Sequence, residues 1–186
     1  MAEKHRKNTS PGVGNIYLTG FMCSGKTLAG RALARALGRR FADSDAAVKL
    51  SSGLSAGDFI RKKGLAAFRR AEAAAVGALA REGGGVVALG GGFYPSGRRA
   101  RLLASTGVTV FLRCPWPELE ERLRRARGPR PLLAGPWEKA AARARKLYSA
   151  RLPYYRRADI TVSTAGLSPA AAAARIKKAL KKRDPR

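Results

Sequence analysis

The chain has few of the residues that mark several common classes of protein. Its 186 residues include two cysteines, which are too few for a disulfide framework and favour a reducing compartment. Aromatic residues make up only 7%, so the core has to be built mainly from Ala, Leu and Val. The single histidine, His5, lies in a charged N-terminal segment. A general base, if the protein needs one, therefore has to be a carboxylate.

Long apolar stretches are also missing. No run approaches the ~20 apolar residues that a membrane-spanning helix requires. The first ten residues, MAEKHRKNTS, contain charges but lack the apolar segment of a signal peptide. The sequence therefore predicts a soluble cytoplasmic protein with no membrane partner.

Acidic residues are scarce beside an excess of basic ones. Asp and Glu total 12 against 38 Lys and Arg, which gives a formal net charge of +26. Such a charge attracts nucleic acid, acidic lipid surfaces or phosphorylated metabolites. The clusters at 4–7 and 177–186 are typical of solvated chain ends. Because the sequence has no aromatic-rich binding strand, helix-turn-helix pattern or zinc pattern, we expect no specific nucleic-acid partner.

The clearest motif that is present is a phosphate-binding loop at residues 20–27, with the sequence GFMCSGKT. It lies between an apolar strand segment and a helix-forming segment, the context in which this pattern has meaning. Its glycines let backbone N–H groups surround an anion at the positive end of the following helix. Lys26 can then reach the β- and γ-phosphates of a nucleotide, and the Thr27 hydroxyl can bind Mg²⁺.

Strand and helix signals alternate along the chain and predict one α/β domain with a parallel sheet and helices on both faces. We expect a basic N-terminal tail at 1–12, the domain at 13–182, a lid near 126–137 and a C-terminal tail at 183–186. The expected strands are 15–19, 40–43, 86–89, 108–113 and 159–163. The expected helices are 26–37, 46–49, 55–61, 65–81, 95–105, 115–125, 137–152 and 169–182. Ligands of such sheets bind at the carboxyl ends of the strands.

The pair Asp43 and Asp45 follows a predicted strand and therefore lies at the same edge of the sheet as the phosphate loop. One carboxylate can hold Mg²⁺. The other can accept a hydrogen bond from a substrate hydroxyl and remove its proton during attack on the γ-phosphate. An Asx turn or a helix N-cap is the structural alternative for both residues.

Two further motifs suggest a substrate site. Arg69 and Glu72 lie three residues apart on one helix face, where Glu72 could hold the guanidinium toward a substrate carboxylate. The alternative is a surface ion pair. Three glycines at 90–92 follow a predicted strand, so their backbone can approach a ligand closely.

Two arginines in later motifs could neutralise charge on a ligand. Arg130 precedes Pro-Leu-Leu in a loop rich in Gly, Pro and Arg, and Arg151 begins the motif R-x-P-x-Y near a helix end. An arginine in a mobile loop can fold over a nucleotide and stabilise developing charge. A solvated surface arginine is the alternative for each.

Taken together and in this order, these motifs resemble the shikimate kinase family of P-loop kinases. The shared features are GFMxSGKT, D-S-D, F-R-R-x-E, G-G-G, R-P-L-L and R-x-P-x-Y, and the similarity runs from Ile16 to Ser168. The resemblance implies a three-layer α/β/α P-loop kinase fold with a five-stranded parallel sheet and a mobile lid. It also implies ATP-dependent phosphorylation of the 3-hydroxyl of shikimate by a monomeric enzyme.

The resemblance also implies a role for each motif residue. Lys26, Asp45 and Arg130 are expected to be catalytic, with Asp45 also bound to the ring hydroxyls, and Thr27 and Asp43 to organise Mg²⁺. The residues expected to contact ATP are Gly20, Cys23, Ser24, Gly25, Lys26, Thr27, Leu28, Arg127 and Arg130. Those expected to contact shikimate are Asp45, Arg69, Glu72, Gly90, Gly91, Gly92 and Arg151. The chain departs from the family pattern at Cys23, where the loop usually has Gly.

Two other functions are compatible with the same motifs. One is a different small-molecule kinase that acts on gluconate, another polyol or a nucleotide. The other is a P-loop ATPase that binds nucleic acid, which the net charge favours. A non-catalytic relative is disfavoured by the presence of Lys26, Asp43 and Asp45.

Overall fold

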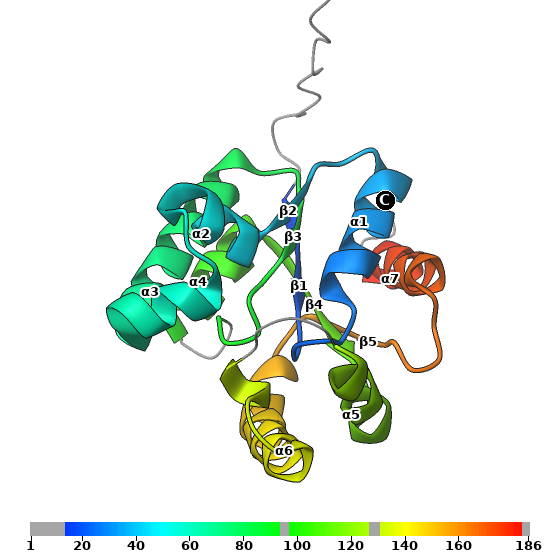
Figure 1. Ribbon diagram of the computed structural model, residues 1–186. Helices are drawn as coiled ribbons and strands as arrows, with labels where there is room; N and C mark the ends of the chain where they lie inside the picture. The colour runs from blue at the N-terminus through cyan, green and yellow to red at the C-terminus, as the bar shows by residue number, and fades with distance from the viewer. Residues whose placement is uncertain (1–13, 94–96, 127–130, 184–186) are drawn as a thin grey trace, which may run out of the picture.

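A parallel sheet lies between two layers of helices (Figure 1). The computed structural model describes residues 14–93, 97–126 and 131–183. The sheet has five strands in the order β2-β3-β1-β4-β5, and every neighbouring pair is parallel. The strands are β1 (Asn15–Thr19), β2 (Phe41–Asp43), β3 (Val86–Ala88), β4 (Gly107–Arg113) and β5 (Ile160–Ser163). The predicted α/β fold with five parallel strands is confirmed.

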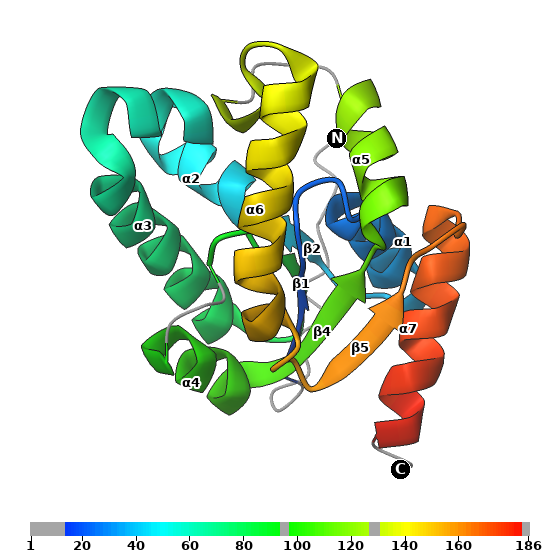
Figure 2. The ribbon, with the colours of Figure 1, turned by 90° about the horizontal axis from the view of Figure 1, so that it is seen from below.

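Helices cover both faces of this sheet. Figures 1 and 2 show α1 and α7 side by side on one face, and α3 and α4 on the other. The helices α5 and α6 lie next to the strand edge that carries the loop after β1. The helices are α1 (Lys26–Leu37), α2 (Ser44–Ser52), α3 (Ala56–Glu82), α4 (Gly97–Thr106), α5 (Trp116–Arg125), the 3₁₀ turn η1 (Pro131–Leu133), α6 (Trp137–Tyr155) and α7 (Pro169–Arg183).

The core is divided between the two faces by the alternation of β1. Tyr17 points into a cluster with aromatic residues of β4 and α6, which include Phe111 and Tyr155. Its neighbours Ile16 and Leu18 point into the opposite cluster, which is built largely from Ala, Leu and Val of α1, α7 and the strands. This alternation follows from the twofold period of side chains in a strand. Side chains of β1 therefore pack into the core on both faces of the sheet.

Two predicted helices have clearly different bounds in the structure. The second helix begins at Ser44 instead of residue 46 and ends at Ser52 instead of residue 49, and at its start the Asp43 carboxylate caps it by accepting from the N–H groups of Asp45 and Ala46. The two helices predicted at 55–61 and 65–81 are both present: α3 spans them, but Gly64 between them has non-helical backbone angles (φ 81°, ψ 160°). Helix α6 continues past residue 152 through Pro153, since the Arg156 N–H still donates to the Leu152 carbonyl.

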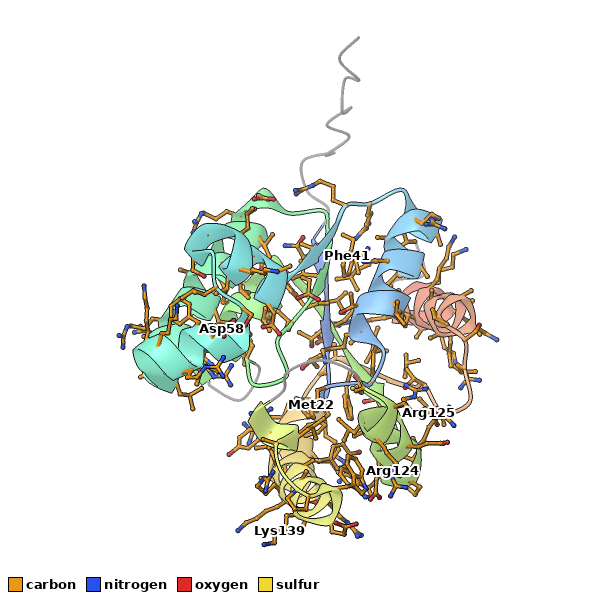
Figure 3. All side chains as sticks on the ribbon, viewed as in Figure 1. Met22, Phe41, Asp58, Arg124, Arg125 and Lys139 are labelled. Atoms are coloured by element: carbon orange, nitrogen blue, oxygen red, sulfur yellow. The ribbon has the colours of Figure 1, made fainter. Side chains whose placement is uncertain are left out.

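The outer surface carries many of the basic side chains. Figure 3 shows Arg124, Arg125 and Lys139 extending from α5 and α6, where all three are exposed. Within the described ranges, no helix combines the length and apolar character needed to cross a membrane. The predicted N-terminal tail at 1–12 lies outside the described residues, as do positions 95–96 of the predicted helix 95–105 and positions 127–130 of the predicted lid. Of the C-terminal tail predicted at 183–186, Arg183 is the last residue of α7 and the rest lies outside the described residues.

Candidate active site

The phosphate loop connects β1 to α1 in the predicted strand-to-helix context. Gly25 precedes α1 in a left-handed conformation (φ 94°), and no side chain caps the helix. The N–H groups of the first turn are therefore directed at the loop, where they can bind an anion. Gly20 has φ 141°, and a Cβ there would lie 2.8 Å from the Leu112 carbonyl oxygen. A side chain at position 20 is thus excluded by both backbone conformation and space.

Lys26 folds back across its own loop. Its ammonium donates to the carbonyl oxygens of Gly20 at 2.9 Å and Phe21 at 2.8 Å. Burial lowers the pKa of Lys26 to about 8, although the nearby carboxylates of Asp45 and Asp43 act in the opposite direction. A phosphate at the loop would add negative charge beside this ammonium and favour its charged form.

Cys23 of the phosphate loop has a left-handed backbone conformation. Its φ is 61°, and it is the only residue other than glycine with a positive φ in the described ranges. Non-glycine residues in this conformation carry a steric cost. The structure therefore gives a physical reason why glycine is usual at this position of the family's loop.

Asp43 connects the loop to the second strand. The Thr27 hydroxyl donates to Asp43 Oδ2 at 2.9 Å, while Asp43 Oδ1 caps α2. Asp43 is therefore a helix N-cap, which was the structural alternative for this residue, and its second oxygen, Oδ2, still faces Thr27. A hydroxyl and a carboxylate oxygen side by side are hard oxygen ligands of the type that Mg²⁺ prefers.

Asp45 is the second residue of α2 and lines the same pocket as Asp43 and Lys26. Desolvation by the surrounding protein, followed by the charges of Asp43 and Glu72, raises its pKa to about 6. The cations Lys26 and Arg69 partly offset this rise. A carboxylate with a pKa closer to neutrality is a better proton acceptor than an ordinary aspartate.

The glycines after β3 lie close to charged side chains of α2 and α3. A Cβ on Gly90 would lie 2.2 Å from Glu72 Oε1 and 2.7 Å from Asp45 Oδ1. A Cβ on Gly92 would lie 2.0 Å from Arg69 Nη2. At both positions the missing side chain allows functional groups from α2 and α3 to approach the loop.

Two guanidinium groups reach the pocket from different helices. Arg69 of α3 pairs with Glu72 at 2.5 Å, and the Glu72 side chain is fully buried with Oε1 left without a hydrogen-bond partner. Because Glu72 is buried, this pair differs from the surface ion pair considered as the alternative. Arg151 of α6 donates to the Gly91 carbonyl oxygen at 3.1 Å. The remaining N–H groups of both arginines are available to a carboxylate.

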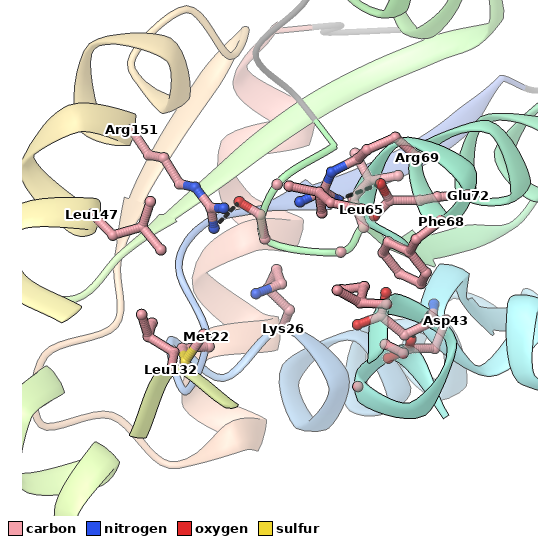
Figure 4. A pocket seen from close by; sticks show the side chains of 18 of the residues that line it. Met22, Lys26, Asp43, Leu65, Phe68, Arg69, Glu72, Leu132, Leu147 and Arg151 are labelled. Carbon is pink, nitrogen blue, oxygen red and sulfur yellow. Dashed lines mark hydrogen bonds and ion pairs between the residues drawn. The ribbon is translucent and has the colours of Figure 1, made fainter. Parts of the chain in front are cut away.

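These residues share one pocket of about 550 Å³. Figure 4 shows Lys26, Asp43, Arg69 and Arg151 arranged around it, with Leu132 and Leu147 on its apolar side. The predicted site residues that line it are Cys23, Lys26, Thr27, Asp43, Asp45, Arg69, Glu72, Gly90, Gly91, Gly92 and Arg151. Elements that are distant in sequence (α1, β2, α2, α3 and α6) and the loops after β1 and β3 therefore bring the predicted groups together.

A second pocket of about 320 Å³ opens on the other side of the phosphate loop. It contains the predicted residues Cys23, Ser24, Gly25 and Leu28, together with Arg122, Thr164, Leu167 and Pro169, which the sequence interpretation missed. Arg122 donates to the Cys23 carbonyl oxygen at 3.3 Å and to the Thr164 carbonyl oxygen at 3.3 Å. A guanidinium and a proline that line one pocket beside a phosphate cradle can both pack against a planar nucleotide base.

Arg122 was missed because its signal in the sequence is weak. It lies among several arginines of α5, and its backbone partners come from the phosphate loop and from the loop after β5, both distant in sequence. The predicted nucleotide-binding residues Arg127 and Arg130 lie outside the described residues. Their positions relative to either pocket stay predictions.

A phosphate cradle, a hydroxyl beside a carboxylate, and an acid flanked by arginines define the class of P-loop phosphotransferases that act on small molecules. Comparison with known proteins identifies the family within this class. The family model described as "Shikimate kinase" matches residues 22–181. The chain belongs to the shikimate kinase family, which uses ATP as its co-substrate.

Individual relatives agree with this assignment. The chain is 41% identical to the shikimate kinase of Moorella thermoacetica, over 90% of this chain and 95% of the relative. It is also 41% identical to that of Thermus thermophilus, over 81% of each chain. Among solved structures, shikimate kinase from Acinetobacter baumannii in complex with shikimate aligns with a TM-score of 0.86 and 31% identity, covering 94% of this chain and 97% of that one. A gluconokinase from Sinorhizobium meliloti aligns with a TM-score of 0.52 at 22% identity, which shows a shared fold alone.

Proposed function

We propose that this chain transfers the γ-phosphoryl group of ATP to the 3-hydroxyl of shikimate, giving shikimate 3-phosphate and ADP. The observation that carries the proposal is the single pocket in which Asp45, Arg69 and Arg151 surround the space beside Lys26. The similarity to a shikimate kinase solved with shikimate supports the same acceptor. An acceptor with both a carboxylate and hydroxyl groups matches the charges of this pocket.

On the acceptor side, Asp45 accepts the proton of the attacking hydroxyl as the new P–O bond forms. Arg69 and Arg151 bind the carboxylate of the acceptor, which orients the ring relative to Asp45. Glu72 holds Arg69 from a buried position. Gly90, Gly91 and Gly92 line the site without side chains that would obstruct the ring.

On the donor side, the loop from Gly20 to Thr27 binds the phosphates of ATP, and Lys26 balances charge on the β- and γ-phosphates. We infer that the adenine ring binds in the second pocket, which Arg122 and Pro169 both line. Within the described residues no group of three or more His, Cys, Asp or Glu side chains could hold a metal ion. Mg²⁺ is usually bound by one or two protein groups, substrate phosphates and water.

Thr27 and Asp43 would hold that Mg²⁺, which supplies charge neutralisation at the transferring phosphoryl group when bound. We further infer that Arg130 reaches the phosphates from the lid and that Arg127 lies nearer the nucleotide base. The protein is expected to act as a monomer in the cytoplasm, without a specific nucleic-acid partner.

The direct test is ADP release with ATP, Mg²⁺ and a panel of acceptors. We expect turnover with shikimate and at most background rates with gluconate or nucleoside monophosphates. Faster turnover with one of the other acceptors would replace shikimate in the proposal. Absence of turnover with all of them, in a folded protein that binds nucleic acid, would favour the ATPase alternative.

Arg69 and Arg151, which together form the proposed carboxylate clamp, can be tested separately from the rest of the site. Arg69→Ala and Arg151→Ala should each raise KM for shikimate at least about tenfold, with little change in KM for ATP, because a charge-assisted hydrogen bond is lost at the acceptor alone. Arg70→Ala is the matched control, since Arg70 is exposed beside Arg69 and does not line the pocket. Equal effects on both substrates would contradict the clamp.

A further inference from the structure

The glycine loop after β3 (Gly90–Gly92) is held at two successive residues by hydrogen bonds, and two of the side chains involved, Ser44 and Tyr155, have no role in the proposed reaction. At its start, the Gly90 N–H donates to the Ser44 hydroxyl at 2.8 Å. One residue later, the Gly91 carbonyl oxygen accepts from Arg151 at 3.1 Å and also from the Tyr155 hydroxyl. Ser44 and Tyr155 are both fully buried.

Ser44 connects the glycine loop to the acidic motif. It lies between Asp43 and Asp45 at the start of α2, so its hydroxyl is fixed by the same helix turn that orients both carboxylates. The Gly90 residue that it binds lies so close to both acids that a Cβ there would be 2.7 Å from Asp45 Oδ1 and 2.2 Å from Glu72 Oε1. A shift of Gly90 would therefore change the space that the loop leaves for the two carboxylates.

Tyr155 connects the glycine loop to the clamp. It follows Arg151 by four residues on α6, so one helix face presents both donors to the same carbonyl oxygen. Its ring stacks on Phe111 of β4 with centroids 5.4 Å apart, which fixes the hydroxyl relative to the sheet. The surrounding core raises the pKa of Tyr155 to about 12, so the hydroxyl keeps its proton as a donor.

We propose that Ser44 and Tyr155 are positioning residues that fix the glycine loop, Ser44 with respect to Asp45 and Tyr155 with respect to Arg151. This inference rests on the proposed function for its kinetic consequences. Ser44 acts on the transfer step, because the loop sets the position of Asp45 and its neighbour Glu72. Tyr155 acts on acceptor binding, because it shares with Arg151 the carbonyl that places the guanidinium.

The chain offers a close control for Tyr155. Tyr148 lies two helical turns earlier on α6, belongs to the same core cluster and donates its hydroxyl to the Cys114 carbonyl oxygen at 3.2 Å. Tyr148→Phe therefore removes a comparable buried hydroxyl without touching the glycine loop. For Ser44, the control is Ser52→Ala, which removes a hydroxyl that donates to Val48 at the other end of α2.

The kinetic experiment measures kcat and both KM values for each variant. Tyr155→Phe should raise KM for shikimate about fivefold and leave KM for ATP within about twofold, as expected for loss of one buried hydrogen bond. Ser44→Ala should lower kcat about tenfold through misplacement of the reacting groups. Ser44→Thr, which retains the hydroxyl, should restore most of this loss. Constants indistinguishable from those of the Tyr148→Phe and Ser52→Ala controls overturn the proposal.

Hydrogen–deuterium exchange of the segment 86–93 gives a readout that does not depend on activity. Ser44→Ala leaves the Gly90 N–H without its acceptor, so this segment should exchange faster than in wild type and in the Ser52→Ala control. Unchanged exchange in both Ser44→Ala and Tyr155→Phe would overturn the proposal, even if turnover fell. If the wild type phosphorylated no shikimate, the proposed function would fail, while the exchange comparison would still decide whether these hydroxyls hold the loop.

Discussion

At the scale of single residues, the charge of Asp45 is useful for chemistry but unfavourable for folding. Its pKa in the folded protein is about 6, above the value of about 3.9 expected in the unfolded chain. The folded state therefore binds this proton more tightly. The resulting cost to stability is fully present above pH 6 and disappears as the pH falls toward the unfolded value.

Replacing Asp45 should therefore separate activity from stability. Asp45→Asn is expected to lower kcat more than about tenfold, because a carboxamide cannot accept the proton of the attacking hydroxyl. ATP binding should survive, and the melting temperature at pH 7.5 should be no lower than that of the wild type. Coupled ADP release, nucleotide titration and thermal unfolding measure the three effects. Near-normal kcat in this variant would remove Asp45 from the mechanism.

The pH dependence of kcat/KM follows from two residues. Protonation of Asp45 removes the base, so the rate should fall as the pH drops through about 6. Lys26 loses its charge as the pH rises through about 8, which weakens ATP binding. The expected profile of the free enzyme is bell-shaped. Residual activity of Asp45→Asn should lack the acidic limb, and a limb that persists there would belong to another group.

At the scale of elements, the glycine loop after β3 offers a steric test of the site. Gly90→Ala would place a methyl group 2.2 Å from Glu72 Oε1, so the loop or both acids would have to move. At Gly91 the nearest atom to a new Cβ is the Gly20 carbonyl oxygen at 3.5 Å, an ordinary contact.

We therefore expect Gly90→Ala to reduce kcat/KM for shikimate at least about a hundredfold, since misplacement by about 1 Å can cost that much. Gly91→Ala should retain most activity. Steady-state kinetics with circular dichroism as a folding check compares the two. Similar losses in both variants would mean that the loop fails for a reason other than the clash with Glu72.

The elements themselves were largely predictable from sequence. The strand β1 and helix α1 match the prediction residue for residue, because glycines bound the loop between them and Gly38 ends the helix. The motifs Asp43–Asp45 and Gly90–Gly92 fell at one sheet edge because parallel strands place their carboxyl ends together, while Arg69 and Glu72 reach the same pocket from α3. Their exact roles stay predictions.

Contacts between distant elements were not predictable. The pocket that joins Arg122 to Pro169 depends on how α5 packs beside the loop after β5, and a single sequence carries no record of that packing. The same holds for Tyr155, whose hydroxyl meets a carbonyl 64 positions away. Pro153 was expected near a helix end, yet buried contacts of Tyr155 keep the last turn helical.

At the scale of the whole molecule, the net charge of +26 should raise the rate at which anionic substrates reach the pocket. ATP and shikimate are both anions, so the positive field favours their encounter with the pocket. Raising the salt concentration from about 20 mM to about 300 mM should lower kcat/KM about two- to tenfold through screening, while kcat changes little.

Substitutions that change charge far from the pocket distinguish the effect of the overall positive field from that of contacts within the pocket. Lys178, Lys181 and Lys182 lie on α7, do not line the pocket and carry exposed basic side chains. Replacing all three by Glu should lower kcat/KM at low salt and have little effect at high salt. A salt response identical to that of the wild type would assign the effect to residues of the pocket alone.

The hydrogen bonds of Lys26 to its own loop affect how the loop binds ATP. With its ammonium held by the carbonyls of Gly20 and Phe21, the cradle keeps its shape before a nucleotide arrives. Entry of ATP is then an exchange of partners, in which phosphate oxygens replace backbone oxygens around a cation that is already in place. Binding of the phosphates therefore requires little rearrangement of the loop.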